Sequence, residues 1–355
     1  MNHKKKRKKN VKAKRWGIVV VIELLLIIIL IPALYIYLKL SSVQEATAAE
    51  VDKANIVINE DVDEVTVQKL KGFKTIALFG LDAREEGSLE DTGSRSDAIM
   101  FVAINNDKKE IKLLSVYRDT CVNVPDYGLE KITHAYAYGG AELSMSTLNK
   151  NFDLSVTEFA SVDFAVLADI IDAVGGLDIE LTDVEVEWIN ECIHEQNRIT
   201  GSDSPDIWES GMQHLDGTQA TAYARIRKAD SDFVRAERQR TVLKLVFEKA
   251  RDISLKSVMK IMDNVLPEVY TNLSKAEMLS LANDLYQYEI VDSEGFPFEK
   301  TTGSLYSDEL SYVFASDYLW NVTEMHKYLY ENEEYQPSAT VQEISNEIYN
   351  NSGYY

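Results

Sequence analysis

The chain of 355 residues is long enough for one large domain or two ordinary ones. Hydrophobic residues make up 45% of it and aromatic residues 10%, which suffices for a packed core and excludes a wholly disordered chain. The formal net charge of -21 excludes a generic nucleic-acid binder, because a polyanion requires a cationic face on its protein partner.

The charge is distributed unevenly along the chain. Residues 1–15 carry nine of the 37 lysines and arginines and no acidic residue. Without this segment and Glu23, 28 basic and 57 acidic residues remain, a net charge of about -29. The sequence therefore predicts a basic tail in front of an acidic body.

An apolar run, residues 16–38, follows the basic tail and contains one charge, Glu23. As a helix it extends about 34 Å, enough to cross the hydrocarbon core of a bilayer. The basic cluster predicts that its N-terminal side is cytoplasmic. We therefore expect a single-pass protein of the cell membrane with an extracellular body. The alternative is a cleaved signal peptide, because Ala46-Thr47-Ala48 resembles a small-residue cleavage site.

The regions that follow differ in composition. Residues 39–72 are polar and acidic, which predicts an extracellular stalk and leaves open whether its later half folds. The folded domain is expected over residues 73–330. Residues 331–355 carry five glutamates and Pro337, and we expect them to form a flexible acidic tail.

Cys121 and Cys192 lack the spacing of metal ligands. An oxidising compartment outside the membrane would allow one disulfide between them. The alternative is two small buried thiols, and the sequence leaves both interpretations open.

Short apolar runs and helical patterns alternate through the folded domain. Strands are predicted at residues 75–80, 98–104, 111–117 and 177–181. Helices are predicted at residues 140–151, 162–174, 184–196, 218–225, 233–251, 254–265 and 275–288. This alternation predicts a mixed α/β domain.

The second and third predicted strands are separated by turn-forming residues, which predicts an antiparallel hairpin. Symmetric pairing places Asp97 opposite Arg118 at the open end of the hairpin, with Arg95 beside them. Asp82 joins the same edge if the first strand runs parallel to the third, and this is the edge where α/β sheets bind ligands. The competing interpretation is a structural salt bridge at the mouth of a hairpin.

A second cluster places six basic residues within sixteen positions of the acidic body. Arg225 and Arg227 share a face only if the chain between them is extended. Arg235 and Gln239 share a face of the helix that begins near Asp232. Guanidinium groups and a helix N-terminus bind phosphate, and a carboxylate among arginines favours a bridging Mg²⁺. The alternative is a solvated helix whose charges pair with one another.

Together the two clusters predict a phosphate or pyrophosphate site. The chain has no Walker A loop, kinase signature, G-x-S-x-G or H-E-x-x-H motif. Catalysis at such a site is expected to depend on positioning and on charge neutralisation by arginine and Mg²⁺. The five histidines show no pairing in the sequence, so no zinc site is expected.

Eight short motifs in this order resemble the LytR-CpsA-Psr family. They lie between about residues 73 and 250, behind a basic tail and one apolar segment. The motifs are Phe79–Asp82, Arg95–Asp97, Leu114–Asp119, Lys131–Gly140, Val174–Leu177, His214–Ala220, Tyr223–Arg227 and Arg238–Arg240.

The resemblance implies an α/β/α sandwich with a mixed central sheet, the LytR-CpsA-Psr catalytic domain, placed outside the cytoplasmic membrane, mainly of Gram-positive bacteria. It implies a Mg-dependent transferase that moves a glycopolymer, such as wall teichoic acid or capsular polysaccharide, from a polyprenyl-pyrophosphate carrier to peptidoglycan. The new link is a phosphodiester. The lipid is expected in an apolar cavity lined by the helices at residues 162–174 and 233–247.

The resemblance also implies roles for individual residues. The pyrophosphate-binding set is Arg95, Arg118, Arg225, Arg227, Arg235 and Gln239. Within it Arg118, Arg225 and Arg227 are also expected to be catalytic, together with Asp82 as the base for the acceptor hydroxyl. Asp97 and Asp232 are expected to hold Mg²⁺.

The chain departs from the family pattern at two positions. Tyr117 replaces a proline and leaves the charged groups intact, whereas Val234 replaces a glycine and is expected to shift Arg235 if it disturbs the helix start.

Two alternative functions remain open at this point. The first is a hydrolase of prenyl-pyrophosphate lipids, which needs the same site, and the second is a non-enzymatic envelope regulator. A nucleic-acid partner is not expected, since only about fifteen residues are expected to be cytosolic.

Overall fold

The computed structural model describes residues 44–45, 51, 53–81, 93–228, 231–253, 261, 265, 268–305 and 311–353. The chain divides into two units, Met1–Val43 and Gln44–Tyr355, and all described residues belong to the second. The predicted basic tail, the predicted membrane segment and Asp82 lie outside the described residues. Within the described part of the chain, no helix has the length and apolar character that a membrane span requires.

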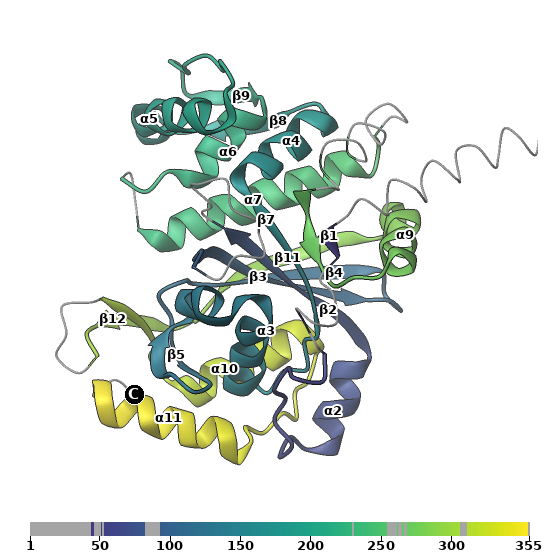
Figure 1. The fold of residues 1–355 in the computed structure, drawn as a ribbon, viewed down its shortest axis with the longest axis vertical. Helices are drawn as coiled ribbons and strands as arrows, with labels where there is room; N and C mark the ends of the chain where they lie inside the picture. The colour runs from purple at the N-terminus through teal and green to yellow at the C-terminus, as the bar shows by residue number, and fades with distance from the viewer. Residues whose placement is uncertain are drawn as a thin grey trace, which may run out of the picture. The chain divides into compact units, whose positions relative to one another are not determined.

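A seven-stranded mixed sheet forms the centre of the fold, in the order β1-β10-β7-β2-β3-β4-β11 (Figure 1). Its strands are β1 (Gln44–Glu45), β2 (Phe73–Leu81), β3 (Ser96–Asn105), β4 (Glu110–Val116), β7 (Glu158–Asp163), β10 (Tyr270–Thr271) and β11 (Glu289–Phe296). β3 is antiparallel to both β2 and β4, while β7 is parallel to β2 and β11 to β4. Consequently β2, β4, β7 and β11 end at the same edge of the sheet, where β3 begins.

Helices cover both faces of this sheet (Figure 1). On one face lie α2 (Glu64–Lys71), α3 (Ile132–Phe152), α10 (Tyr318–Tyr330) and α11 (Ala339–Ser352). On the other lie α4 (Phe164–Val174), α5 (Asp183–Thr200), α6 (Gly217–Arg225), α7 (Asp232–Ala250) and α9 (Lys275–Asp284), which a short 3-10 helix, η3 (Leu285–Gln287), follows. The smaller pairs are β5 (Cys121–Val124) with β6 (Gly128–Lys131), β8 (Leu177–Leu181) with β9 (Gly211–Leu215), and β12 (Lys300–Gly303) with β13 (Tyr312–Ala315).

Alternate side chains of the central strands produce the layers. In β2, Ala77 and Phe79 enter the core that contains α3, α10 and α11, whereas Ile76 and Leu78 enter the core beneath α7 and α9. Successive side chains of a strand point to opposite faces, so a central strand of apolar residues requires cover on both sides. The α/β/α arrangement with a mixed sheet is thus confirmed.

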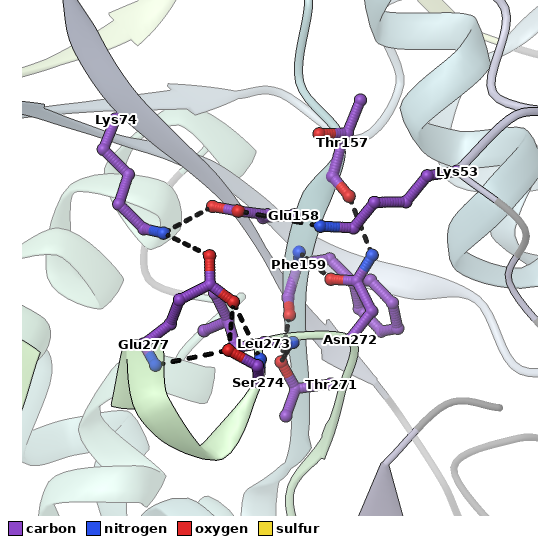
Figure 2. Close-up of polar contacts among 10 residues, drawn as sticks. All are labelled: Lys53, Lys74, Thr157, Glu158, Phe159, Thr271, Asn272, Leu273, Ser274 and Glu277. Atoms are coloured by element: carbon purple, nitrogen blue, oxygen red, sulfur yellow. Dashed lines mark hydrogen bonds and ion pairs between the residues drawn. The ribbon is translucent and has the colours of Figure 1, made fainter. Parts of the chain in front are cut away.

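An ion-pair cluster joins α9 to the sheet at the edge opposite the one where β2 ends (Figure 2). The Lys74 ammonium lies 2.8 Å from Glu158 Oε2 and 3.0 Å from Glu277 Oε1. Asn272 binds the start of β7, because its Oδ1 accepts from the Phe159 amide at 3.0 Å. These contacts hold the far ends of β2 and β7 together.

The predicted boundaries of the domain are wrong at both ends. Val51, Ile56 and Leu70 belong to the main core, so the folded domain begins well before residue 73. The expected flexible tail at residues 331–355 contains α11, whose Val341 and Ile348 are buried. Apolar side chains at helical spacing bury this segment despite its acidic surface.

The two cysteines are free thiols. Cys121 is buried in β5, and burial raises the pKa of its thiol. Cys192 is half-buried in α5, and burial raises the pKa of its thiol as well. The interpretation as two buried thiols therefore fits the structure better than a disulfide.

Candidate pyrophosphate site

The β3–β4 hairpin has the predicted symmetric register. Asn105 pairs with Glu110 at the turn, and Ile99 pairs with Val116 near the open end. Just beyond that pair, Arg118 Nη1 donates a hydrogen bond to Asp97 Oδ1 at 2.7 Å. The symmetric pairing predicted for the hairpin therefore correctly placed Asp97 next to Arg118.

Asp97 gathers three guanidinium groups around one carboxylate. Its other oxygen, Oδ2, accepts a hydrogen bond from Arg227, and Arg235 Nη2 lies 3.5 Å from its backbone carbonyl oxygen. Asp97 is only 7% exposed. Burial raises the pKa of this carboxyl, but Arg118, Arg227 and Arg235 together outweigh it, so the pKa lies below its ordinary value. The group is a carboxylate at neutral pH.

The first turn of α7 supplies the second carboxylate. Asp232 Oδ1 lies 2.7 Å from Arg235 Nη2 and 3.5 Å from Arg118 Nε. Arg118 thus stands between Asp97 and Asp232, and the two predicted metal ligands lie in one cluster.

Buried guanidinium nitrogens in this cluster lack acceptors. Burial lowers the pKa of Arg235 to about 10, and this side chain is 2% exposed. Among the described residues, Arg235 Nε and Nη1 and Arg118 Nε have no hydrogen-bond partner. A buried donor without an acceptor costs free energy, and an oxyanion is the kind of acceptor that such N–H groups bind.

The cluster borders a polar pocket of 640 Å³. Four of the predicted residues line it: Arg95, Asp97, Arg118 and Arg227. The remaining polar lining is Ser94, Asp119, Lys131, Thr133 and His134. Symmetric pairing of the hairpin also predicts Asp119 beside Asp97 and Arg118, but the sequence assigned no role to Lys131, Thr133 and His134, although the Lys131–Gly140 motif contains them. The signal available in the sequence was the chain order. β5 begins just after Asp119, and β6 and the start of α3 follow it, so these residues lie at the same edge of the sheet.

An apolar cavity of 260 Å³ lies on the other side of the same strand. Ala98 lines this cavity, while its neighbour Asp97 lines the polar pocket. The cavity walls come from β2, β3, β7, α4, α6 and α7, and include Phe79, Val162, Phe164, Leu167, Gln239, Val242 and Val246. It occupies the place expected for a lipid cavity between the helices at residues 162–174 and 233–247.

Two predicted site residues lie elsewhere. Arg225 Nη1 donates to Gln196 Oε1 at 2.8 Å, and its Nη2 lies 3.3 Å from Glu195, so α5 holds this guanidinium away from Asp97. Arg225 and Arg227 do not share a face because α6 continues through Arg225 and ends only at Ile226. Gln239 lines the apolar cavity instead of the arginine cluster.

The alternative of a solvated, self-paired helix is wrong for α7. Arg235, Arg238 and Arg240 are 2%, 3% and 7% exposed. Arg238 Nε donates to Glu185 Oε1 of α5 at 2.8 Å, which is a buried tertiary ion pair. The three arginines of α7 therefore lie in the interior of the domain.

The two departures from the family pattern leave the cluster in place. Tyr117 is buried edge-on against Phe233, with ring centroids 4.6 Å apart. Val234 is half-buried in the first turn of α7, and Arg235 still reaches both Asp232 and Asp97. The expected disturbance by Val234 is absent among these contacts.

Known proteins share this fold and sequence pattern. The LytR_cpsA_psr family matches residues 34–327. The polyisoprenyl-teichoic acid–peptidoglycan teichoic acid transferase TagT of Bacillus subtilis is 28% identical over 306 residues, 83% of this chain and 90% of its own. The corresponding transferase TagU of Bacillus mycoides is 31% identical and covers 70% of this chain and 76% of its own.

Solved structures agree with the sequence comparison. The structure titled "TagT bound to LIIa-WTA" superposes with a TM-score of 0.59 at 26% identity, over 74% of this chain and 92% of that one. The family match extends over most of the chain and includes every motif from Phe79 to Arg240. This chain belongs to the LytR-CpsA-Psr family.

Proposed function

We propose that this protein is a membrane-anchored, extracytoplasmic phosphotransferase that moves a glycopolymer from a polyprenyl-pyrophosphate carrier to peptidoglycan. The glycopolymer is of the teichoic acid or capsular polysaccharide type. The observation that carries the proposal is the division at β3, where Asp97 lines a cationic pocket and Ala98 an apolar cavity. A lipid pyrophosphate has the same division, and the names of the TagT and TagU relatives support the reaction.

The arginines bind the pyrophosphate in this proposal. Arg118 and Arg235 have buried N–H groups without a hydrogen-bond partner in the described part of the chain, and Arg95, Arg118 and Arg227 add charge at the pocket wall. A guanidinium group matches phosphate oxygens in two-point contacts. Fixed cations stabilise the charge that develops on the leaving phosphate, so most of the rate enhancement comes from electrostatics and positioning.

Asp97 and Asp232 suit a magnesium ion. Mg²⁺ binds proteins through one or two carboxylates and takes its other ligands from phosphates and water. The described residues contain no group of three or more histidine, cysteine, aspartate or glutamate side chains that would bind a metal without substrate. When bound, the ion would neutralise pyrophosphate oxygens.

The reaction exchanges the phosphoanhydride bond of the pyrophosphate for a new phosphate ester. A sugar hydroxyl of peptidoglycan attacks the phosphorus attached to the glycopolymer, and a new phosphorus–oxygen bond forms. The bond to the bridging pyrophosphate oxygen breaks, and polyprenyl phosphate leaves. The hydroxyl proton goes to a base, for which Asp82 remains our proposal; it lies outside the described residues.

The test is product analysis with the full-length chain. The protein receives a polyprenyl-pyrophosphate-linked saccharide and peptidoglycan oligomers, with Mg²⁺ or with a chelator, and mass spectrometry follows the saccharide. We expect a saccharide phosphate on the acceptor, lost with chelator and in Arg118→Ala. Arg198→Ala, an exposed arginine at the end of α5, is the matched control.

Other products would overturn the proposal. Free saccharide phosphate without conjugate would identify a hydrolase that uses water as acceptor. Tight lipid binding without any product would identify an envelope sensor.

A further inference from the structure

Two tyrosines stack on each other at the surface near the polar pocket. Tyr127 lies in the turn between β5 and β6, and Tyr138 lies in α3. Their ring centroids are 4.4 Å apart and their planes differ by 20°. Tyr127 is 53% exposed and Tyr138 38%. Large aromatic side chains are usually well covered, so a stacked and exposed pair indicates a binding surface.

The backbone fixes the outer tyrosine. Asp126 has a φ of 66° and Gly128 a φ of 78°, so left-handed residues stand on both sides of Tyr127. The Tyr127 amide donates to the Val124 carbonyl at 3.0 Å and closes the turn. Left-handed backbone outside glycine is uncommon. The turn therefore presents the Tyr127 ring on a rigid support.

His134 connects the two stacked tyrosines, here called the aromatic platform, with the polar pocket. It lines the pocket, its ring lies 5.8 Å from the Tyr138 ring, and its Nδ1 lies 2.7 Å from Glu130 Oε2. Burial raises the pKa of the Tyr138 phenol, and the charge of Arg95, also in the pocket wall, partly offsets that rise. A ligand that lies on the tyrosines thus extends into the site of reaction.

The chemistry of this surface fits a sugar ring. A pyranose presents C–H groups on its flat face, which pack on an aromatic ring, and hydroxyls at its edge, which bind charged side chains. His134 and Glu130 lie beside the Tyr138 ring, and Lys131, whose ammonium lies 3.0 Å from Asp119, lines the adjoining pocket. The apolar cavity lies on the other side of β3, so a donor lipid held there would leave this side free.

We propose that Tyr127 and Tyr138 form the acceptor subsite, where a sugar of the peptidoglycan glycan strand stacks with its reacting hydroxyl directed past His134 into the pocket. The proposal rests on the transferase function proposed above. It assigns the donor to the apolar cavity and the arginines, and the acceptor to the aromatic platform.

The first experiment measures binding without turnover. Full-length wild type and the variants Tyr127→Ala, Tyr138→Ala, Tyr127→Phe and Tyr286→Ala are titrated with uncrosslinked peptidoglycan glycan strands. We expect about a ten-fold weaker affinity in both platform alanine variants, because each loses one stacking contact; ten-fold corresponds to about 1.4 kcal/mol. Tyr127→Phe keeps the ring, and Tyr286, 64% exposed in η3, is the matched control; both should bind as wild type does.

The second experiment separates this proposal from the transferase proposal. With saturating lipid donor, the platform alanine variants should show an acceptor KM about ten-fold higher and an unchanged affinity for the donor. If the wild-type protein binds the glycan strands but forms no conjugate, the transferase function is refuted and the aromatic platform is not. Wild type that does not bind strands, or alanine variants with unchanged affinity and acceptor KM, would refute the platform.

Discussion

At the scale of single residues, Asp97 decides whether the arginines stay together. Arg118, Arg227 and Arg235 repel one another, and Asp97 and Asp232 are the carboxylates that oppose this repulsion. Because Asp97 is buried, its charge is weakly screened by solvent. Of these carboxylates, Asp97 contacts all three arginines, and the hairpin register fixes its position.

Asp97→Asn is expected to lower kcat/KM of the proposed transfer about 100-fold, which corresponds to about 2.7 kcal/mol of transition-state stabilisation. The amide keeps the shape of the side chain and removes the charge that aligns Arg118 and Arg227. Steady-state kinetics with the lipid-linked donor measures the effect. Asp178→Asn, an exposed carboxylate that pairs with Lys249, should leave the rate unchanged. A loss shared by both variants would contradict a specific role.

The same substitution predicts a pH dependence of stability. The folded pKa of Asp97 lies below its ordinary value of 3.8, so its ion pairs contribute fully above that value. The contribution is lost as the pH falls through the folded pKa. We expect urea unfolding at pH 7 to show Asp97→Asn less stable by about 3 kcal/mol. The difference should shrink below pH 4, and a constant difference down to pH 2 would contradict the prediction.

Arg235 illustrates the cost of a preformed anion site. Burial lowers its pKa to about 10, which means that the buried charge is held at a cost in free energy. Arg235→Met is expected to lower the free energy of unfolding by about 3 kcal/mol, because Asp232 loses its partner at 2.7 Å, and to weaken pyrophosphate binding. Thermal denaturation with and without inorganic pyrophosphate measures both effects. Unchanged stabilisation by pyrophosphate would show that Arg235 serves the fold alone.

At the scale of elements, α11 shows how a polar segment becomes part of the core. Asp153 is fully buried and accepts hydrogen bonds from Tyr335 at 2.6 Å, from the Ser338 hydroxyl at 2.7 Å and from Asn59 at 2.7 Å. Ser338 also caps α11 through Val341. One carboxylate thus joins the segment before α2, the end of α3 and the start of α11.

Tyr335→Phe is expected to lower the free energy of unfolding by about 2 kcal/mol, because the buried Asp153 carboxyl group loses one of its hydrogen-bond donors. The transfer rate should not change, since Tyr335 is not among the residues that line the polar pocket. Urea denaturation and the transfer assay test the two parts. Tyr286→Phe is the exposed control. A wild-type unfolding curve for Tyr335→Phe would contradict this account of α11.

At the scale of the whole molecule, β3 separates a polar pocket from an apolar cavity. The polar pocket lies beside its first residues, and the apolar cavity lies against Ala98 and Met100. An apolar chain gains free energy by leaving water, and a pyrophosphate requires charged donors. Only a site that holds both environments next to each other accommodates the junction of lipid and phosphate.

Ala160→Phe is expected to separate the contribution of the apolar cavity to binding from that of the polar pocket. Ala160 of β7 lines the cavity, and a ring at this position fills space that the lipid chain would occupy. The affinity for a long-chain polyprenyl pyrophosphate should fall at least ten-fold, whereas the affinity for inorganic pyrophosphate should not change. Isothermal titration calorimetry with each ligand measures the two affinities. An equal loss for both ligands would show that the cavity does not hold the lipid.

The sequence by itself determined the features that depend on near neighbours. The turn at residues 105–110 fixed the hairpin register, and with it the contact of Asp97 with Arg118, because pairing across a tight turn is a local property. Helix periodicity located α4, α6 and α7 to within a few residues. The motifs then identified the family, which the comparisons confirmed.

Only the tertiary structure decided which side chains meet. Arg225 and Arg227 diverge because α6 ends between them, and the direction of a side chain changes wherever the backbone leaves a helix. The folding of residues 331–352 depends on Asp153, almost two hundred positions away in the chain. The neighbourhood of Tyr127, Tyr138 and the polar pocket likewise arises from the packing of β5 and β6 against α3, and composition contains no record of it.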